Sequence, residues 1–146
     1  DFGGFSDFGV QKPCLIQHNG ITLKEFPVPM ATVLGKRLAY SGGGYFRFFP
    51  LGFVKKEMVK SDYAMCYFHL GDLLPESNGV MSREAYEAYF KESGTLKARY
   101  MRYLKSNLGK KGALAKMMKL IESEDFVNVA QSCERLDWNN VPIVKL

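Results

Sequence analysis

The sequence has no long apolar run: none of its 146 residues lies in a stretch of the roughly 18 to 20 apolar residues that span a bilayer. We therefore expect no transmembrane segment. The chain opens at Asp1 without an initiator methionine, a basic leader or a signal-type apolar stretch, so we expect no signal peptide in it. Its abrupt start in Gly- and Phe-rich sequence is typical of a piece of a longer protein.

Cysteine is scarce and the cysteines are not closely spaced. Cys14, Cys66 and Cys133 stand far apart, and their odd number argues against a disulfide framework. No set of His, Cys, Asp or Glu residues has the spacing of metal ligands. We expect three free structural thiols, and no metal bound by this chain alone.

Apolar and aromatic residues are plentiful, at 47% and 14% of the chain, which is more than a disordered segment carries. The length suits one domain with its own core. We expect residues 1–146 to form a single domain or domain fragment: a loop and hairpin entry over 1–20, a core over 21–136 and a tail over 137–146.

Positive charge is concentrated between Thr95 and Leu120, where no acidic residue occurs. The chain carries a net charge of +5. Such a run can attract phosphates, anionic lipid or an acidic glycan, and the alternative is two solvated helix faces. Nucleic-acid binding would require affinity that falls steeply with salt, and we do not expect nucleic acid as a partner. The basic residues are Lys97, Arg99, Arg102, Lys105, Lys110, Lys111, Lys116 and Lys119.

Strand-like and helix-like segments alternate along the chain. Asn19-Gly20 between two β-prone runs predicts a hairpin. Asp62–Leu70 is apolar on both faces, which predicts a central strand of a parallel sheet. Residues 126–129 are predicted to form a final strand. Helices are predicted after Pro50, after the N-cap Ser82, and over about 97–108, 114–121 and 130–136. The pattern predicts an α/β fold with a mainly parallel sheet.

His69 is the first candidate for chemistry. It ends the predicted central strand, where α/β folds place catalytic groups, and an imidazole transfers protons near neutral pH. Asp72 follows closely enough to orient it. The plainer interpretation is a hydrogen-bonded core histidine beside a solvated acid, and His18 is most simply a turn residue.

The segment Ser41–Pro50, SGGGYFRFFP, is the second candidate. Consecutive glycines permit close backbone approach to a ligand, but their spacing matches neither common phosphate-binding motif. Arg47 can clamp a substrate oxygen or brace a carboxylate of the fold. The candidate binding residues are Gly42, Gly43, Gly44, Tyr45, Arg47 and Tyr67.

Four segments, in order, resemble the later part of the polysaccharide deacetylase (NodB-homology) family, in its exopolysaccharide-locus branch. Ile21–Pro27 resembles a Leu-x-Glu-x-Pro strand, and Ser41–Pro50 is similar to a Gly-Gly-Gly-Tyr-Phe-Arg-x-x-Pro block. Tyr67–Asp72 resembles a Tyr-x-His-Pro-Trp-Glu motif, and Arg99–Tyr103 an Arg-Phe-Arg-His-Tyr segment. The glycine-rich block is the most specific match.

The resemblance implies the C-terminal part of a distorted (β/α) barrel that removes N-acetyl groups from a bacterial glycan. In such enzymes zinc or another divalent metal is held by residues that precede the present segment, so the resemblance implies an inactive fragment and an N-terminal half as partner. It implies that His69 protonates the departing amine or steadies the tetrahedral intermediate. It also implies a bacterial protein, cytoplasmic or membrane-associated, acting in glycan assembly.

Two departures from the family pattern affect the expected function. Leu70-Gly71-Asp72 replaces Pro-Trp-Glu, which removes an aromatic wall and shortens the acid by one methylene. A helix over about 82–93 is inserted after the motif. The alternative is therefore a non-catalytic glycan-binding or scaffolding module of the same fold, with Tyr45, Phe46 and Tyr67 as stacking surfaces.

Overall fold

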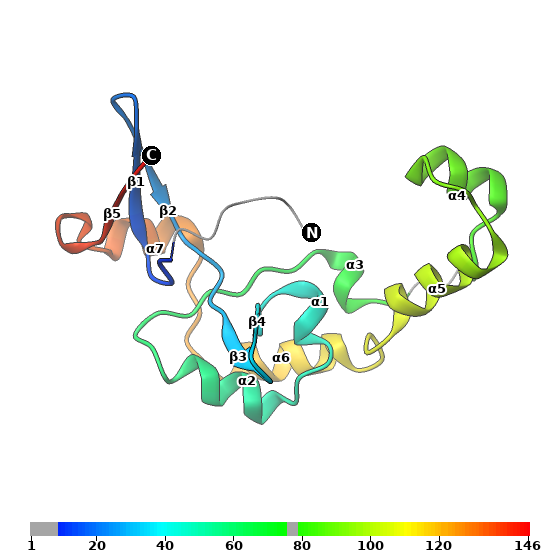
Figure 1. Ribbon diagram of the computed structural model, residues 1–146. Coiled ribbons are helices and arrows are strands. Elements are labelled where there is room, and N and C mark those ends of the chain that lie inside the picture. The colour runs from blue at the N-terminus through cyan, green and yellow to red at the C-terminus, as the bar shows by residue number, and fades with distance from the viewer. Residues whose placement is uncertain (1–8, 76–78) are drawn as a thin grey trace.

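The structure is a computed structural model that describes residues 9–75 and 79–146, and within them the chain is a mixed α/β protein (Figure 1). A small sheet with α7 lies at one end, a helical core lies in the middle, and α4 and α5 form an arm at the other end. The strands are β1 (Cys14–His18), β2 (Ile21–Glu25), β3 (Ala31–Val33), β4 (Lys36–Leu38) and β5 (Ile143–Lys145). The helices are α1 (Gly43–Phe46), α2 (Leu51–Met58), α3 (Leu70–Leu73), α4 (Arg83–Phe90), α5 (Leu96–Asn107), α6 (Ala113–Ser123) and α7 (Val129–Arg135).

The predicted first hairpin is present. β1 pairs antiparallel with β2 across Asn19 and Gly20, whose φ angles of 47° and 79° suit a tight turn that follows the strand twist. The tail, for which the sequence indicated no element, adds β5 parallel to β1, giving the order β2-β1-β5. The two ends of the described chain therefore meet in one sheet.

A second hairpin leads into the core. β3 and β4 pair antiparallel around Leu34 and Gly35, both with positive φ. Phe46 and Val54 are fully buried, and Phe46 packs edge-on against Phe68 at 4.8 Å between ring centroids. α1, α2 and α6 enclose this cluster (Figure 1), so the glycine-rich block enters the best-packed part of the molecule.

The predicted helices form, with local caps where the sequence offers them. The side chains of Ser82 and Thr95 accept hydrogen bonds from the backbone N–H groups of Ala85 and Ala98. Asn128 and Gln131 form a reciprocal capping box on α7. Among the described residues, no helix has both the length and the apolar character needed to cross a bilayer.

Two strand predictions are wrong, and so is the mainly parallel sheet. The predicted strand Asp62–Leu70 begins in a bend and ends where α3 starts at Leu70, and it makes only one bridge, between Gly42 and Tyr67, because α1 begins at Gly43 and no ladder partner continues in the described chain. Phe126–Val129 is coil running into α7. In the described chain, two of the three strand pairs are antiparallel and no barrel closes.

The core is small for the length of the chain. Within the described residues only nine hydrophobic side chains are buried, while Leu34, Leu70 and Tyr89 are 98%, 82% and 76% exposed. The accessible surface is 10502 Å² for 16.5 kDa, whereas a compact monomer of that mass exposes about 7,500 Å². Many apolar side chains therefore lack a covering layer within this chain.

The three cysteines are free, as expected. Burial raises the pKa of the Cys66 thiol to about 11 and also raises the pKa of Cys14, whereas Cys133 is partly exposed, with Sγ 3.4 Å from the Lys24 ammonium. Because the thiolate is the nucleophile, we expect iodoacetamide at neutral pH to label Cys133 first, as peptide mass spectrometry would show. Labelling of Cys66 as fast as Cys133 would contradict this burial.

Candidate functional site

The backbone joins the two candidate motifs. The N–H of Gly43 donates to the carbonyl of Tyr67 at 2.9 Å, and the N–H of Tyr67 donates to the carbonyl of Ser41 at 3.3 Å. The buried Ser41 hydroxyl donates to the carbonyl of Met65 at 2.6 Å. The glycine-rich block and the segment before His69 therefore lie side by side as one unit.

Of the three consecutive glycines, Gly43 is the one that the packing requires. A Cβ there would lie 2.1 Å from Oδ2 of Asp72 and 2.7 Å from its Cγ. A Cβ at Gly42 would make ordinary contacts at 3.5 Å or more, and one at Gly44 would meet nothing within 4 Å. The block thus holds space for the Asp72 carboxylate at Gly43.

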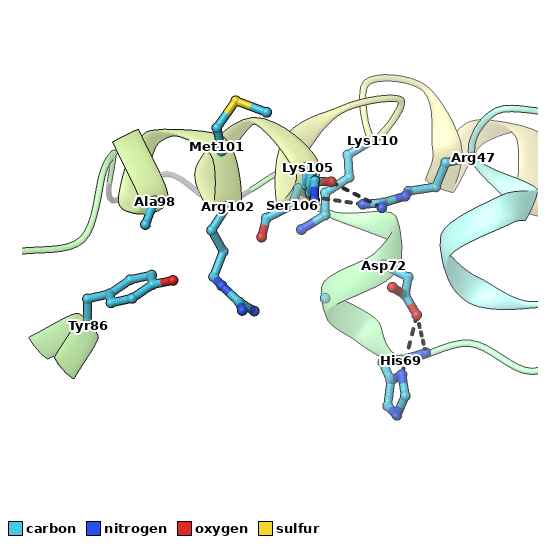
Figure 2. A pocket seen from close by; sticks show the side chains of 11 residues that line it. Arg47, His69, Asp72, Tyr86, Ala98, Met101, Arg102, Lys105, Ser106 and Lys110 are labelled. Carbon is cyan, nitrogen blue, oxygen red and sulfur yellow. Dashed lines mark hydrogen bonds and ion pairs between the residues drawn. The ribbon is translucent and has the colours of Figure 1, made fainter. Parts of the chain in front are cut away.

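His69 lies between two polar groups. Its Nε2 is 2.9 Å from the hydroxyl of Tyr67, and its Nδ1 is 3.3 Å from Oδ2 of Asp72 (Figure 2). The same Oδ2 accepts the backbone N–H of His69 at 3.1 Å, where α3 begins. Because a carboxylate only accepts hydrogen bonds, a proton on Nδ1 would face Oδ2 of Asp72 and leave Nε2 to accept from the Tyr67 hydroxyl.

His69 is not the buried strand-end residue that the sequence predicted. It is the N-cap residue of the short helix α3, and its side chain is 72% exposed, whereas Asp72 is 23% exposed. The segment before it has no second strand partner in the described chain, which leaves the imidazole uncovered. The ring faces an open pocket rather than a closed cavity.

Arg47 supports the C-terminal end of α5. Its guanidinium donates to the carbonyl of Ser106 at 2.8 Å and to that of Lys105 at 3.3 Å, and its Nε donates to the carbonyl of Gly44. These carbonyls at a helix end lack helical partners and attract cations. The observed partners are backbone oxygens rather than a carboxylate of the fold, and the other role considered for Arg47, clamping a substrate oxygen, stays a prediction.

Lys116 of α6 secures the turn that carries Arg47. Its ammonium donates to the carbonyls of Phe46, Arg47 and Phe49, the last at 2.8 Å, and lies 4.5 Å from the centroid of the Phe46 ring. Burial lowers the pKa of this amine. This member of the basic run is therefore a structural group, not part of a solvated helix face.

A pocket of about 700 Å³ connects the two motifs with the arm (Figure 2). Arg47, His69 and Asp72 line it from one side, and α4 and α5 line it from the other. The sequence noted the basic run of α5 but did not connect it with His69. The added lining side chains are Tyr86, Ala98, Met101, Arg102, Lys105, Ser106 and Lys110.

The other candidate residues lie around this unit. Tyr45 and Tyr67 are 41% and 50% exposed, so both can contact a ligand, whereas Phe46 is fully buried. The expectation that Phe46 offers a stacking surface is therefore wrong. His18 lies in the distant hairpin, where its Nδ1 is 3.1 Å from the carbonyl of Leu146.

The described residues do not by themselves form a metal centre. They contain no group of three or more His, Cys, Asp or Glu side chains placed to hold an ion. His69 and Asp72 are a pair, and the nearby cations would oppose a metal. A metal at this site would need ligands from outside the described residues.

Fold and site together define a mixed α/β domain in which an exposed histidine and a largely covered aspartate lie against a glycine-rich turn. The model of the family described as domain of unknown function (DUF3473) matches residues 1–134. The match covers most of the chain, which therefore belongs to this family. No curated protein and no solved structure matches the chain.

Proposed function

We propose that the chain is the C-terminal part of a metal-dependent carbohydrate deacetylase, which removes N-acetyl groups from a bacterial glycan when joined to the preceding half of the domain. The observation that carries the proposal is the Tyr67–His69–Asp72 arrangement beside Gly43. It holds an imidazole at the surface with one nitrogen directed at a carboxylate and the other at the hydroxyl of Tyr67.

In this proposal His69 delivers a proton to the departing amine. Hydrolysis of the amide uses one water, breaks the C–N bond and yields acetate and a free amino group on the sugar. A carboxylate base in the preceding half would take the proton of the attacking water, and Nε2 of the imidazolium gives its proton to the leaving nitrogen, while Asp72 keeps Nδ1–H oriented. Tyr67 must release its hydrogen bond to Nε2 when substrate enters. The metal, with its ligands from the preceding half, would polarise the acetyl carbonyl.

The small hydrophobic core supports the proposal that a preceding half of the domain completes the fold. Leu70, next to His69, is 82% exposed, and the extended run before it pairs at a single position. Strands from the preceding half would supply the missing ladder partners and cover these side chains, completing a (β/α) barrel of the deacetylase type. A small buried core is expected when one domain is divided and the apolar side chains of one half lose the layer that covers them.

The test uses the natural full-length protein with its metal. We expect it to release acetate from N-acetylated oligosaccharides, measured by an enzyme-coupled acetate assay, and we expect this chain alone to release none. If the full-length protein binds metal normally yet frees no acetate from chito-oligosaccharides or other acetylated glycans, catalysis is refuted. Glycan binding that persists in that protein would then favour the alternative, a non-catalytic module using the exposed rings of Tyr45 and Tyr67.

A further inference from the structure

The pocket beside His69 has an uneven charge. Four basic side chains line it, from Arg47, Arg102, Lys105 and Lys110, and Asp72 is the only acidic residue among the described lining residues. The carboxylate of Asp72 is engaged by His69. The side facing the arm is therefore positively charged and attracts an anion.

Arg102 and Lys105 are the cations best placed to meet a ligand. Arg47 is held by backbone carbonyls, and Lys110 is only 3% exposed. Arg102 extends from α5 into the space between α4 and α3 (Figure 2), with its guanidinium 3.8 Å from the centroid of the Phe90 ring. Its contact with Glu92 is long, at 4.0 Å, and both side chains are well exposed.

The ring of Phe90 holds the Arg102 guanidinium in place without neutralising it. A planar guanidinium held in this way can donate two parallel hydrogen bonds to a carboxylate. Lys105, one helical turn from Met101 and exposed on α5, adds a second positive charge at the same opening. The two side chains together suit an anionic group carried by a compact ligand.

The volume favours a sugar over a nucleic-acid strand. About 700 Å³ falls in the range of roughly 300–1,000 Å³ in which small ligands are bound. A strand would need cations along an extended track, but Arg99 and Lys116 of the same basic run are bonded to backbone carbonyls. Of the exposed cations of this run, Arg102 and Lys105 line the pocket beside His69, whereas Lys97, Lys111 and Lys119 do not.

We propose that the pocket binds the carboxylate of an acidic sugar through Arg102 and Lys105, so that the substrate is an N-acetylated glycan that also carries uronic acid residues. This inference rests on the proposed function, which it narrows to a class of substrate. The carboxylate would lie in the mouth of the pocket toward α5, which places the neighbouring sugar toward His69.

The test is calorimetric titration of the full-length protein with two hexasaccharide probes. Hyaluronan hexasaccharide alternates N-acetylglucosamine with glucuronate, and chitohexaose is N-acetylated but neutral. We expect the hyaluronan probe to bind roughly tenfold more tightly at low salt, with an advantage that shrinks as salt is raised. Arg102→Gln and Lys105→Gln should each remove most of that advantage, because each lowers the affinity for the hyaluronan probe much more than the affinity for chitohexaose.

Lys97→Gln is the matched control, because Lys97 is an exposed cation of the same helix that does not line the pocket. Equal affinity for the two probes, or an equal loss in Lys97→Gln and Arg102→Gln, would overturn the proposal. Hexathymidylate binding as tightly as the hyaluronan probe, with the same Arg102 dependence, would also overturn it in favour of nucleic acid. Titration requires no turnover, so failure here is distinct from an absence of acetate release.

Discussion

Replacing Gly43 with alanine is expected to expel the Asp72 carboxylate from its place beside His69 and to lower the free energy of unfolding by about 1–2 kcal/mol. The new Cβ would lie 2.1 Å from Oδ2 of Asp72. The carboxylate must move, and it then loses the hydrogen bond from the His69 backbone N–H at the start of α3. The same movement frees Nδ1 of His69, so activity should fall together with stability.

Gly44→Ala is the matched control for Gly43→Ala. It makes the same chemical change one residue away, also in α1, where a Cβ would meet nothing within 4 Å. Chemical denaturation of the full-length protein measures both variants. Equal stability losses in the two variants would contradict the required close approach at Gly43.

A double-mutant cycle measures the coupling between Gly43 and Asp72. In an Asp72→Ala background the atoms that Gly43 must accommodate are gone, because the close contacts are with Asp72 Oδ2, Cγ and Oδ1. Gly43→Ala should then be nearly neutral, and the two substitutions should be strongly non-additive. Additive losses would mean that Gly43 is required for a reason other than Asp72.

Features that depend on neighbours in sequence were predictable. The Asn19-Gly20 turn and the Ser82 cap follow from residues within three positions of each other, and both formed as expected. Asp72 was also suggested as the group that orients His69, three residues away, and the two side chains do meet. Local hydrogen bonding and backbone preference decide such features before tertiary packing does.

Features that depend on distant partners were not predictable from the pattern. The apolar alternation of Asp62–Leu70 indicated a central strand, yet a strand needs neighbours that supply hydrogen bonds, and the described chain supplies one bridge. Apolar character shows that a segment tends to be covered, not what covers it. The same limit applies to the exposed stripe of α5, which includes Leu96, Tyr100 and Leu104.

The pocket could not be predicted from the sequence either, because residues far apart in the chain form it. Arg47 and Ser106 are 59 residues apart, and their hydrogen bond brings the cations of α5 to the histidine site. The sequence showed the charge run and the His-x-x-Asp pair separately, without any local signal that relates them. The space that Gly43 leaves for Asp72 was equally hidden, because three adjacent glycines look alike in sequence and only one is constrained.

Loss of the imidazole should have the largest effect on the proposed activity. We expect His69→Gln in the full-length protein to lower kcat for acetate release by roughly 10²–10⁴-fold, the range for a general acid, with little change in KM. Because the side chain is 72% exposed, the free energy of unfolding should change by less than about 0.5 kcal/mol. Asp72→Asn should lower kcat less, since an amide can still accept the His69 backbone N–H but no longer stabilises the imidazolium.

His18→Gln is the matched control, because it replaces the other histidine of the chain at an exposed position in the distant hairpin. Full activity in His18→Gln together with a collapse of kcat in His69→Gln would tie the loss to the pocket rather than to histidine content or to folding. Tyr67→Phe tests whether the Tyr67 hydroxyl itself contributes to proton transfer. It removes only the hydroxyl that lies 2.9 Å from Nε2, and since that hydrogen bond must break when substrate binds, kcat should hold within a few-fold. A His69→Gln variant that keeps wild-type kcat would show that the exposed imidazole takes no part in proton transfer, whatever the chain binds.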